Sequence, residues 1–330
     1  MRPFKYSRVT EPRTASKLVT SNLRAQFLAG GTNLIDLMKE DVERPDQLVD
    51  ITRIKMADVK DSATSISIGG FGKNTATANH PLIRQNFPLL TQAILAGASA
   101  QIRNMATNGG NINQRTRCSY FYETSMPCNK REPGTGCGAF EGINRMHAIF
   151  GWSDKCIAVN PSDMCIALAA LDAVVNIQGS NGEERSLPFA DYHRLPGDEP
   201  QKDNNLKHGE LVISIEIPKN RFANNSSYLK IRDRSSYAFA LISVAAALEL
   251  DGALIKEVRI AMGGVAHKPW RALEAEKFLK EKPATAANFK AAAEAEMQHA
   301  KAFEYNKFKI EMGKKAIVRA LQKAMTGDKV

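Results

Sequence analysis

The sequence predicts an α+β protein built from two domains. Its 330 residues correspond to about two domains of roughly 150 residues each. Strand-like and helix-like segments are mixed along the first two thirds of the chain, while a pair of strands precedes a helix-rich stretch at the end. The composition, with 43% hydrophobic and 24% charged residues, is that of a globular protein and excludes a wholly disordered or coiled-coil chain.

Hydropathy and charge exclude further classes of protein. The longest apolar stretch, residues 238–248, has 11 residues, whereas a membrane-spanning helix needs about 20. The first residues lack the apolar core of an export signal, so we expect none on this chain. About half of the net charge of +10 lies in the last thirty residues, which we interpret as a solvated helix face. We therefore expect neither a membrane span nor a nucleic acid partner.

A Gly-Gly turn between a strand and a helix is the first candidate for a binding site. Residues 25–39 predict a short strand, the turn and then a helix, with Thr32 or Asn33 as the N-cap. Backbone N–H groups are exposed in such a turn, no Cβ blocks the approach of a ligand, and the helix dipole favours negative charge. The turn is therefore a candidate anion site, although it lacks the G-x-G-x-x-G pattern of nicotinamide-binding proteins.

A second Gly-Gly turn follows about eighty residues later, at residues 106–111. The preceding segment, residues 88–106, has helical periodicity. Two turns that face one pyrophosphate are more specific evidence than either turn alone. Thr and Asn side chains at their edges can also donate to phosphate oxygens.

The middle of the chain alternates between strand and helix patterns. Residues 62–78 predict a strand that ends in a Gly-rich turn, and residues 156–179 predict a strand, a turn, a helix capped by Ser162 and a second strand. Residues 193–205 form a polar loop, and residues 211–218 form a strand that ends at a proline.

Residues 220–227 mark a boundary, after which the pattern changes. Two strand-like runs are joined at Asp251–Gly252, a strong hairpin signal. The remainder, from about residue 270 to 329, is rich in Ala, Lys and Glu and predicts helices.

The five cysteines lie within 48 consecutive residues, which points to metal ligation rather than to a disulfide framework. Tight C-x₂₋₄-C zinc knuckles are missing, whereas the spacings of iron–sulfur ligands vary more. Cys165 lies in an apolar helical run and is expected to pack as a small core residue. The predicted ligands are the other four: Cys118, Cys128, Cys137 and Cys156. Two alternatives are scattered structural thiols and a site in which His147 replaces one cysteine.

Four motifs in order resemble the FAD-binding subunit of the molybdenum hydroxylases, the xanthine dehydrogenase and aldehyde oxidase family. They are AGGTNL at 29–34, TNGGN at 107–111, NPSD at 160–163 and GELVISIEIP at 209–218. The cysteine segment is similar to the insertion of bacterial periplasmic aldehyde oxidoreductases, whose FAD subunits carry an additional [4Fe–4S] cluster. Most members of the family lack the roughly fifty residues that lie here between the second turn and the Ser-Asp motif.

The resemblance implies a fold of the vanillyl-alcohol-oxidase (PCMH) type for residues 1–220. Two subdomains, about 1–55 and 56–220, clasp FAD, with the [4Fe–4S] insertion at about 112–158. A CO-dehydrogenase-flavoprotein-type C-terminal α+β domain, residues 221–330, contributes a three-stranded sheet and helices. The implied FAD-binding residues are Gln26, Phe27, Leu28, Ala29, Gly30, Gly31, Thr32, Asn33, Leu34, Thr107, Asn108, Gly110, Asn111, Asp163, Val212 and Lys230. Among them, Asp163 accepts from the sugar-alcohol hydroxyls of the flavin, and Lys230 lies near its ring.

The resemblance further implies an electron-transfer subunit of a heterotrimeric aldehyde oxidoreductase. A large subunit holds the molybdenum cofactor, a small subunit holds two [2Fe–2S] clusters, and FAD on this chain passes electrons to an external acceptor such as ferredoxin or oxygen. The complex is expected in the periplasm, through a partner's signal, or in the cytoplasm. The alternative is the medium subunit of a xanthine dehydrogenase or 4-hydroxybenzoyl-CoA reductase-like complex.

Two further hypotheses concern the cysteine segment. Residues 115–137 carry a net charge of +2, from Arg115, Arg117, Lys130 and Arg131 against two acids, and a basic lid of this kind can attract an acidic ferredoxin. A protein of a different class, a zinc- or cluster-based nucleic-acid sensor, is favoured only by the basic tail and the cysteines.

Overall fold

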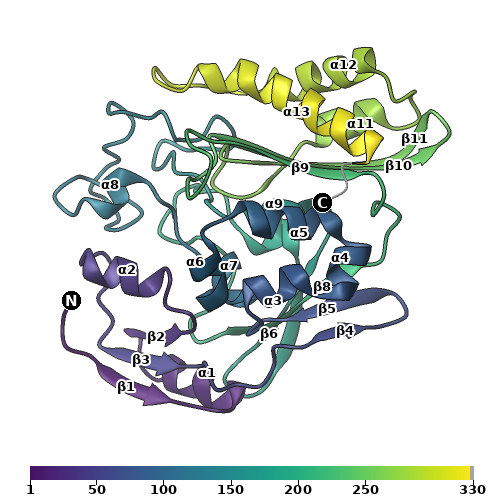
Figure 1. Ribbon diagram of the computed structural model, residues 1–330. Coiled ribbons are helices and arrows are strands. Elements are labelled where there is room, and N and C mark those ends of the chain that lie inside the picture. Colours follow the sequence, from purple (N-terminus) through teal and green to yellow (C-terminus); the bar gives the residue numbers. More distant parts are fainter. Residues whose placement is uncertain (328–330) are drawn as a thin grey trace.

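The computed structural model describes residues 1–327, which form three β-sheets joined and covered by helices (Figure 1). The last three residues of the expected C-terminal domain, 328–330, lie outside the described residues. In Figure 1 the purple N-terminal sheet lies at the bottom, the C-terminal sheet lies near the top, and yellow helices cover it. The predicted α+β content is confirmed.

The N-terminal sheet has three parallel strands in the order β1-β3-β2. Its strands are β1 (Lys5–Arg8), β2 (Ala25–Leu28) and β3 (Gln47–Asp50), and its helices are α1 (Pro12–Thr20) and α2 (Leu34–Lys39). The predicted strand, turn and helix at residues 25–39 are confirmed. Asn33 stands at the N-cap position, but its side chain makes no capping bond; its Oδ1 accepts from the Arg115 backbone N–H at 3.0 Å instead.

The middle sheet has five antiparallel strands in the order β4-β5-β8-β6-β7. Its strands are β4 (Val59–Asp61), β5 (Ser65–Gly69), β6 (Val174–Gln178), β7 (Glu184–Pro188) and β8 (Leu211–Pro218). The central strand β8 is the one predicted to end at Pro218, and its alternate residues are buried in the core.

Seven helices accompany this sheet, and two of them reach the C-terminal sheet. They are α3 (Asn74–Asn79), α4 (Pro81–Asn86), α5 (Pro88–Ala96), α6 (Ala100–Met105), α7 (Asn108–Ile112), α9 (Asp163–Ala170) and α10 (Phe189–Tyr192). Helices α5 and α9 pack on one face of the C-terminal sheet (Figure 1). None of the helices within residues 1–327 is both long and apolar enough to cross a membrane.

The single helix expected over residues 88–106 is in fact two helices. The chain breaks at Gly97 and at Ala98, which has a φ of +49°. A Cβ at Gly97 would lie 3.1 Å from Oδ2 of Asp163. The break therefore lets the backbone approach the Asp163 carboxylate closely, a long-range contact that periodicity does not reveal.

The C-terminal sheet has four antiparallel strands in the order β12-β11-β10-β9, followed by three helices. The elements are β9 (Ser226–Ile231), β10 (Ile242–Asp251), β11 (Leu254–Gly263), β12 (Trp270–Arg271), α11 (Leu273–Leu279), α12 (Ala286–Met297) and α13 (Phe308–Thr326). The hairpin at Asp251–Gly252 is confirmed. The fourth strand, β12, is a two-residue edge that the expected three-stranded sheet lacks.

Both faces of the C-terminal sheet are buried. Ala245 and Ala247 on β10 belong to the core formed with α5 and α9, whereas Val244, Ala246 and Leu248 belong to the core beneath α11 to α13. Alternate residues of one strand therefore serve two cores, as the side-chain period of a strand requires. This sheet joins the C-terminal helices to the rest of the molecule.

The segment between α7 and α9 is irregular apart from α8 (Ser119–Tyr122), and it forms the loops around α8 in Figure 1. The strand expected at the start of residues 156–179 is wrong. Asn160 Oδ1 accepts the Ser162 backbone N–H at 2.9 Å, and this turn replaces an extended strand. Ser162 then caps α9 as predicted, since its Oγ accepts the backbone N–H of Cys165 at 3.1 Å.

Candidate functional site

A cleft of about 1270 Å³ lies between the N-terminal sheet, the second glycine turn and the edge of the C-terminal sheet. Fourteen of the sixteen residues implied by the resemblance line it: Gln26, Phe27, Ala29, Gly30, Gly31, Thr32, Asn33, Leu34, Thr107, Gly110, Asn111, Asp163, Val212 and Lys230. Leu28 and Asn108 do not. The Leu28 side chain packs beneath the first turn, 3.6 Å from where a Cβ on Gly31 would stand.

The two glycine turns are packed directly against each other. A Cβ on Gly30 would lie 2.1 Å from the carbonyl oxygen of Met105, so only glycine fits at this position. Gly31 has a φ of +72°, in the left-handed region that favours glycine. Residues of both turns line the same cleft, and the prediction that both turns face one pyrophosphate stays a prediction.

The first turn offers unused hydrogen-bond donors to the cleft. Within residues 1–327, the backbone N–H groups of Gly30, Gly31, Thr32 and Asn33 have no acceptor, and the buried Nδ2 of Asn33 has none either. A buried donor without a partner is costly, so Asn33 Nδ2, together with the free N–H groups beside it, indicates a ligand rich in acceptor oxygens. A pyrophosphate fits this turn.

The second turn is different, because its N–H groups already donate hydrogen bonds to acceptors in the protein. Asn108 and Gly109 donate to Gly72 and Gly70 carbonyls at 2.9 and 2.8 Å, and Gly110 donates to Thr107 Oγ1 at 3.1 Å. The fully buried Asn108 amide also donates to Gly69 O at 2.9 Å and Thr77 Oγ1 at 2.8 Å. Asn108 thus fastens the turn to the middle sheet and does not face the cleft.

Asp163 and Lys230 form a buried ion pair at the wall of the cleft. Lys230 Nζ lies 2.8 Å from Asp163 Oδ2 and also donates to Ala96 O at 3.1 Å, while the Tyr228 hydroxyl donates to Asp163 Oδ1 at 2.7 Å. The resemblance implies separate roles for Asp163 and Lys230. Their pairing means that each holds the other in one orientation at the wall of the cleft.

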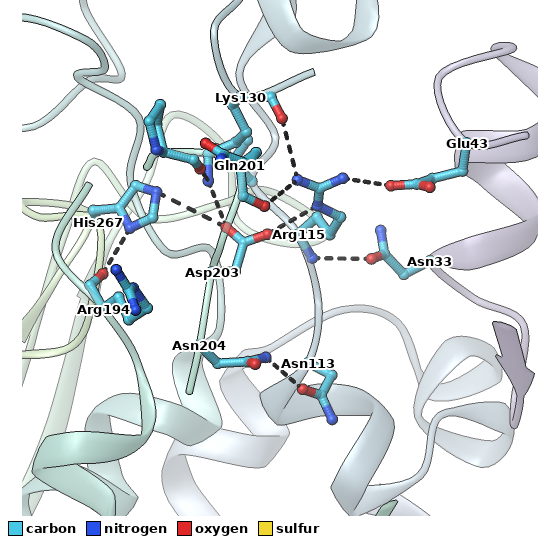
Figure 2. Close-up of polar contacts among 12 residues, drawn as sticks. Asn33, Glu43, Asn113, Arg115, Lys130, Arg194, Gln201, Asp203, Asn204 and His267 are labelled. Carbon is cyan, nitrogen blue, oxygen red and sulfur yellow. Dashed lines mark hydrogen bonds and ion pairs between the residues drawn. The ribbon is translucent and has the colours of Figure 1, made fainter. Parts of the chain in front are cut away.

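A network of charges joins the cleft to the cysteine segment (Figure 2). Asp203 lies 2.8 Å from Arg115 Nε and 2.5 Å from Lys130 Nζ, and Arg115 also pairs with Glu43. Burial raises the pKa of the Asp203 carboxyl, but the Lys130 and Arg115 charges offset this effect and hold its pKa well below its usual range. Burial and the Lys130 charge lower the pKa of the neighbouring His267 to about 3, which leaves that ring neutral.

This network corrects the hypothesis of a basic lid. Lys130 is only 2% exposed, and the charges of Lys130 and Arg115 are balanced by acids. Arg117 pairs with Asp36 at 2.7 Å, and Arg131 donates to backbone carbonyls. The basic residues of the segment therefore hold it in place. Sequence analysis missed Asp203, because an acid in a polar loop gives no signal that it will be buried against distant cations.

The four predicted cysteine ligands line one small cavity together with His147, and Cys165 lies elsewhere, fully buried in α9. Burial raises the pKa of the Cys118 thiol to about 12 and that of Cys156 to about 11. Within residues 1–327, no three His, Cys, Asp or Glu side chains converge on one metal-ion position. In a [4Fe–4S] cluster each thiolate binds a different iron, so the ligands are spread around a larger group than a single ion.

Comparison with known proteins identifies the family. The FAD binding domain in molybdopterin dehydrogenase matches residues 2–220, and the CO dehydrogenase flavoprotein C-terminal domain matches residues 227–325. The chain therefore belongs to the family of FAD-binding subunits of molybdenum hydroxylases. It is an oxidoreductase subunit of the aldehyde oxidoreductase and xanthine dehydrogenase family.

Two relatives cover most of the chain. The aldehyde oxidoreductase FAD-binding subunit PaoB of Escherichia coli is 46% identical over 272 residues, 82% of this chain and 84% of PaoB. The glyceraldehyde dehydrogenase medium chain of Sulfolobus acidocaldarius is 30% identical over 275 residues, 83% of this chain and 80% of the relative. Both names describe subunits of aldehyde-oxidising enzymes.

Solved structures share the fold over nearly the whole chain. A chain of carbon monoxide dehydrogenase from Hydrogenophaga pseudoflava superposes with a TM-score of 0.77 at 23% identity, over 98% of this chain and 97% of that chain. A chain of quinoline 2-oxidoreductase from Pseudomonas putida 86 does so with a TM-score of 0.75 at 21% identity, over 98% and 97%. These likenesses confirm the expected fold type.

Replacing Gly30 with Ala should separate the two glycine turns. The added Cβ would collide with the Met105 backbone, so we expect the free energy of unfolding to fall by about 2 kcal/mol and FAD to bind more weakly. Chemical denaturation and FAD titration measure these effects. Gly313→Ala is the control, since its Cβ would meet the flexible side-chain ends of Met297 and Met262 and no backbone atom. A Gly30→Ala protein as stable as the control would contradict the tight packing.

Replacing Asp203 with Asn should destabilise the protein, because Arg115 and Lys130 would lose their common counter-ion. We expect the free energy of unfolding to fall by about 3 kcal/mol in denaturant titrations. Asp233→Asn is the matched control. Asp233 also pairs with an arginine, Arg145, but the pair is exposed and its loss should cost less than about 1 kcal/mol. Equal effects of the two substitutions would contradict this prediction, because the buried network would then stabilise the protein no more than an exposed ion pair.

Proposed function

We propose that this chain is the FAD- and [4Fe–4S]-containing electron-transfer subunit of a heterotrimeric molybdenum-dependent aldehyde oxidoreductase. In this proposal a large subunit holds the molybdenum cofactor, a small subunit holds [2Fe–2S] clusters, and electrons leave this chain to an external acceptor such as ferredoxin or oxygen. The observation that carries the proposal is the cavity lined by four cysteines and joined by Lys130, Asp203 and Arg115 to the FAD cleft. FAD exchanges electrons in pairs or singly, and an iron–sulfur cluster exchanges them singly.

The residues of the cleft suggest how FAD is held. The N–H groups of residues 30–33 supply neutral donors for its pyrophosphate, as in other dinucleotide sites. We assign Asp163 to the hydroxyls of the flavin's sugar alcohol and Lys230 to the edge of the ring, with the ion pair between them holding both side chains in place. We assign residues 1–220 to the FAD-binding domain and residues 221–330 to the C-terminal domain.

Identity favours an aldehyde as the substrate of the complex over a purine. The aldehyde oxidoreductase subunit is 46% identical to this chain, whereas a putative xanthine dehydrogenase FAD-binding subunit of Escherichia coli is 24% identical. We expect the chain, purified with its large and small subunits, to show flavin bleaching on anaerobic addition of an aldehyde but not of xanthine. Reduction by xanthine alone would contradict the proposal and favour the alternative, a xanthine dehydrogenase-like complex.

Serine substitutions test the four ligands. We expect Cys118→Ser, Cys128→Ser, Cys137→Ser and Cys156→Ser to lose iron and acid-labile sulfide, because each removes one thiolate from the cavity. The control is Cys165→Ser, which should keep both, since its thiol is fully buried in α9 outside that cavity. Chemical analysis of iron and sulfide per flavin measures the outcome. Loss in Cys165→Ser with retention in Cys156→Ser would contradict the ligand assignment.

A further inference from the structure

A buried lysine without a counter-ion contacts the backbone of His147, a residue that lines the cysteine cavity. Lys309, at the start of α13, is fully buried, and its Nζ donates to the carbonyl oxygens of His147 at 2.9 Å and Gly264 at 2.7 Å. Among residues 1–327, no carboxylate lies within ion-pair distance of this ammonium. The other buried lysine of the region, Lys130, differs, because Asp203 balances it.

An ammonium in this position is costly unless an anion is nearby. Burial lowers the pKa of Lys309 to about 7, and the positive charge of Arg145 lowers it further. Core positions of this kind are normally apolar, so a lysine held by two backbone carbonyls calls for a negative group that the polypeptide does not supply.

His147 connects Lys309 to the cysteines. Its carbonyl oxygen accepts from Lys309 and also from the buried Asn306 amide at 3.2 Å, so its backbone is held from two sides. Its ring Nε2 lies 3.1 Å from Cys118 Sγ, while its buried Nδ1 has no partner within the described residues. The one polar contact of the ring is therefore with a cysteine sulfur.

We propose that Lys309 is the counter-charge of the [4Fe–4S] site and that His147, positioned by Lys309 and Asn306, donates an N–H···S hydrogen bond to Cys118. This inference rests on the proposed function. A cluster held by four thiolates carries net negative charge, and both a nearby positive charge and hydrogen bonds to sulfur favour its reduced form. Lys309 and His147 together raise the reduction potential of the cluster. Neither is a ligand: Lys309 acts through its charge and by positioning His147, and His147 acts through its hydrogen bond to the sulfur of Cys118.

The test compares variants of Lys309 in the complete heterotrimeric complex. Lys309→Met removes the charge and the hydrogen bonds, and Lys309→Gln removes the charge but keeps an amide donor. We expect both to shift the cluster potential to more negative values, measured by redox titration of its electron paramagnetic resonance signal. Iron content and the FAD potential should stay as in the wild type. Lys314→Met is the control, because Lys314 lies on the same helix but pairs with Glu311 near the surface.

The counter-charge, the hydrogen bond and the proposed function are each tested by a separate result. A fully loaded Lys309→Gln complex with the wild-type cluster potential would overturn the counter-charge. A second measurement uses the wild-type complex and so does not depend on how a variant folds: after labelling with ¹⁵N-histidine, pulsed electron paramagnetic resonance should detect one nitrogen coupled to the cluster. A His147→Leu complex that retains its iron should lose this coupling, which assigns the nitrogen. No coupled nitrogen in the wild type would overturn the hydrogen bond. Wild-type complex without iron would instead contradict the proposed function.

Discussion

The carboxylate of Asp203 is the interaction on which the relation between the two candidate sites depends. It accepts from Arg115, which starts the cysteine segment, and from Lys130, which lies within it. Arg115 in turn reaches Glu43 and Asn33 beside the first glycine turn. Because buried charges must be balanced, an acid at this one position fixes the segment, the turn and the polar loop relative to one another. Two acids balance two bases, so the network holds the parts together without adding net charge between the sites.

The two glycine turns have different roles in forming the cleft. The first turn keeps its N–H groups free and presents them to the cleft. The N–H groups of the second turn are already hydrogen-bonded within the protein, those of Asn108 and Gly109 to the carbonyls of Gly72 and Gly70. The Asn108 side chain fastens the turn to β5 and α3. The second turn is thus rigid and supports the first turn, which carries the free donors. The two turns meet at the close contact between Gly30 and the Met105 backbone. Preorganised donors of this kind bind an anion without a further ordering cost.

Local patterns in the sequence were sufficient for features that short segments determine by themselves. The strand, turn and helix at residues 25–39, the hairpin at Asp251–Gly252 and the Ser162 cap are of this kind. Features that arise from contacts far apart in the chain could not be predicted in this way. The break at Gly97 depends on Asp163, and the burial of Lys130 depends on Asp203. The resemblance to the family predicted most of the residues that line the cleft. It did not predict the ion pair of Asp163 with Lys230, which is seen only in the three-dimensional structure.

The sequence separation of the charges around Asp203 has a consequence for folding order. Glu43, Arg115, Lys130 and Asp203 come from positions spread over more than 150 residues, and contacts between such distant positions form late. The pairing of β5 with β8 in the middle sheet spans a similar separation, from Ser65 to Pro218, so it belongs to the same stage of folding. Neither the middle sheet nor the charge network can therefore close before the ribosome has made about two thirds of the chain, up to Pro218 at the end of β8.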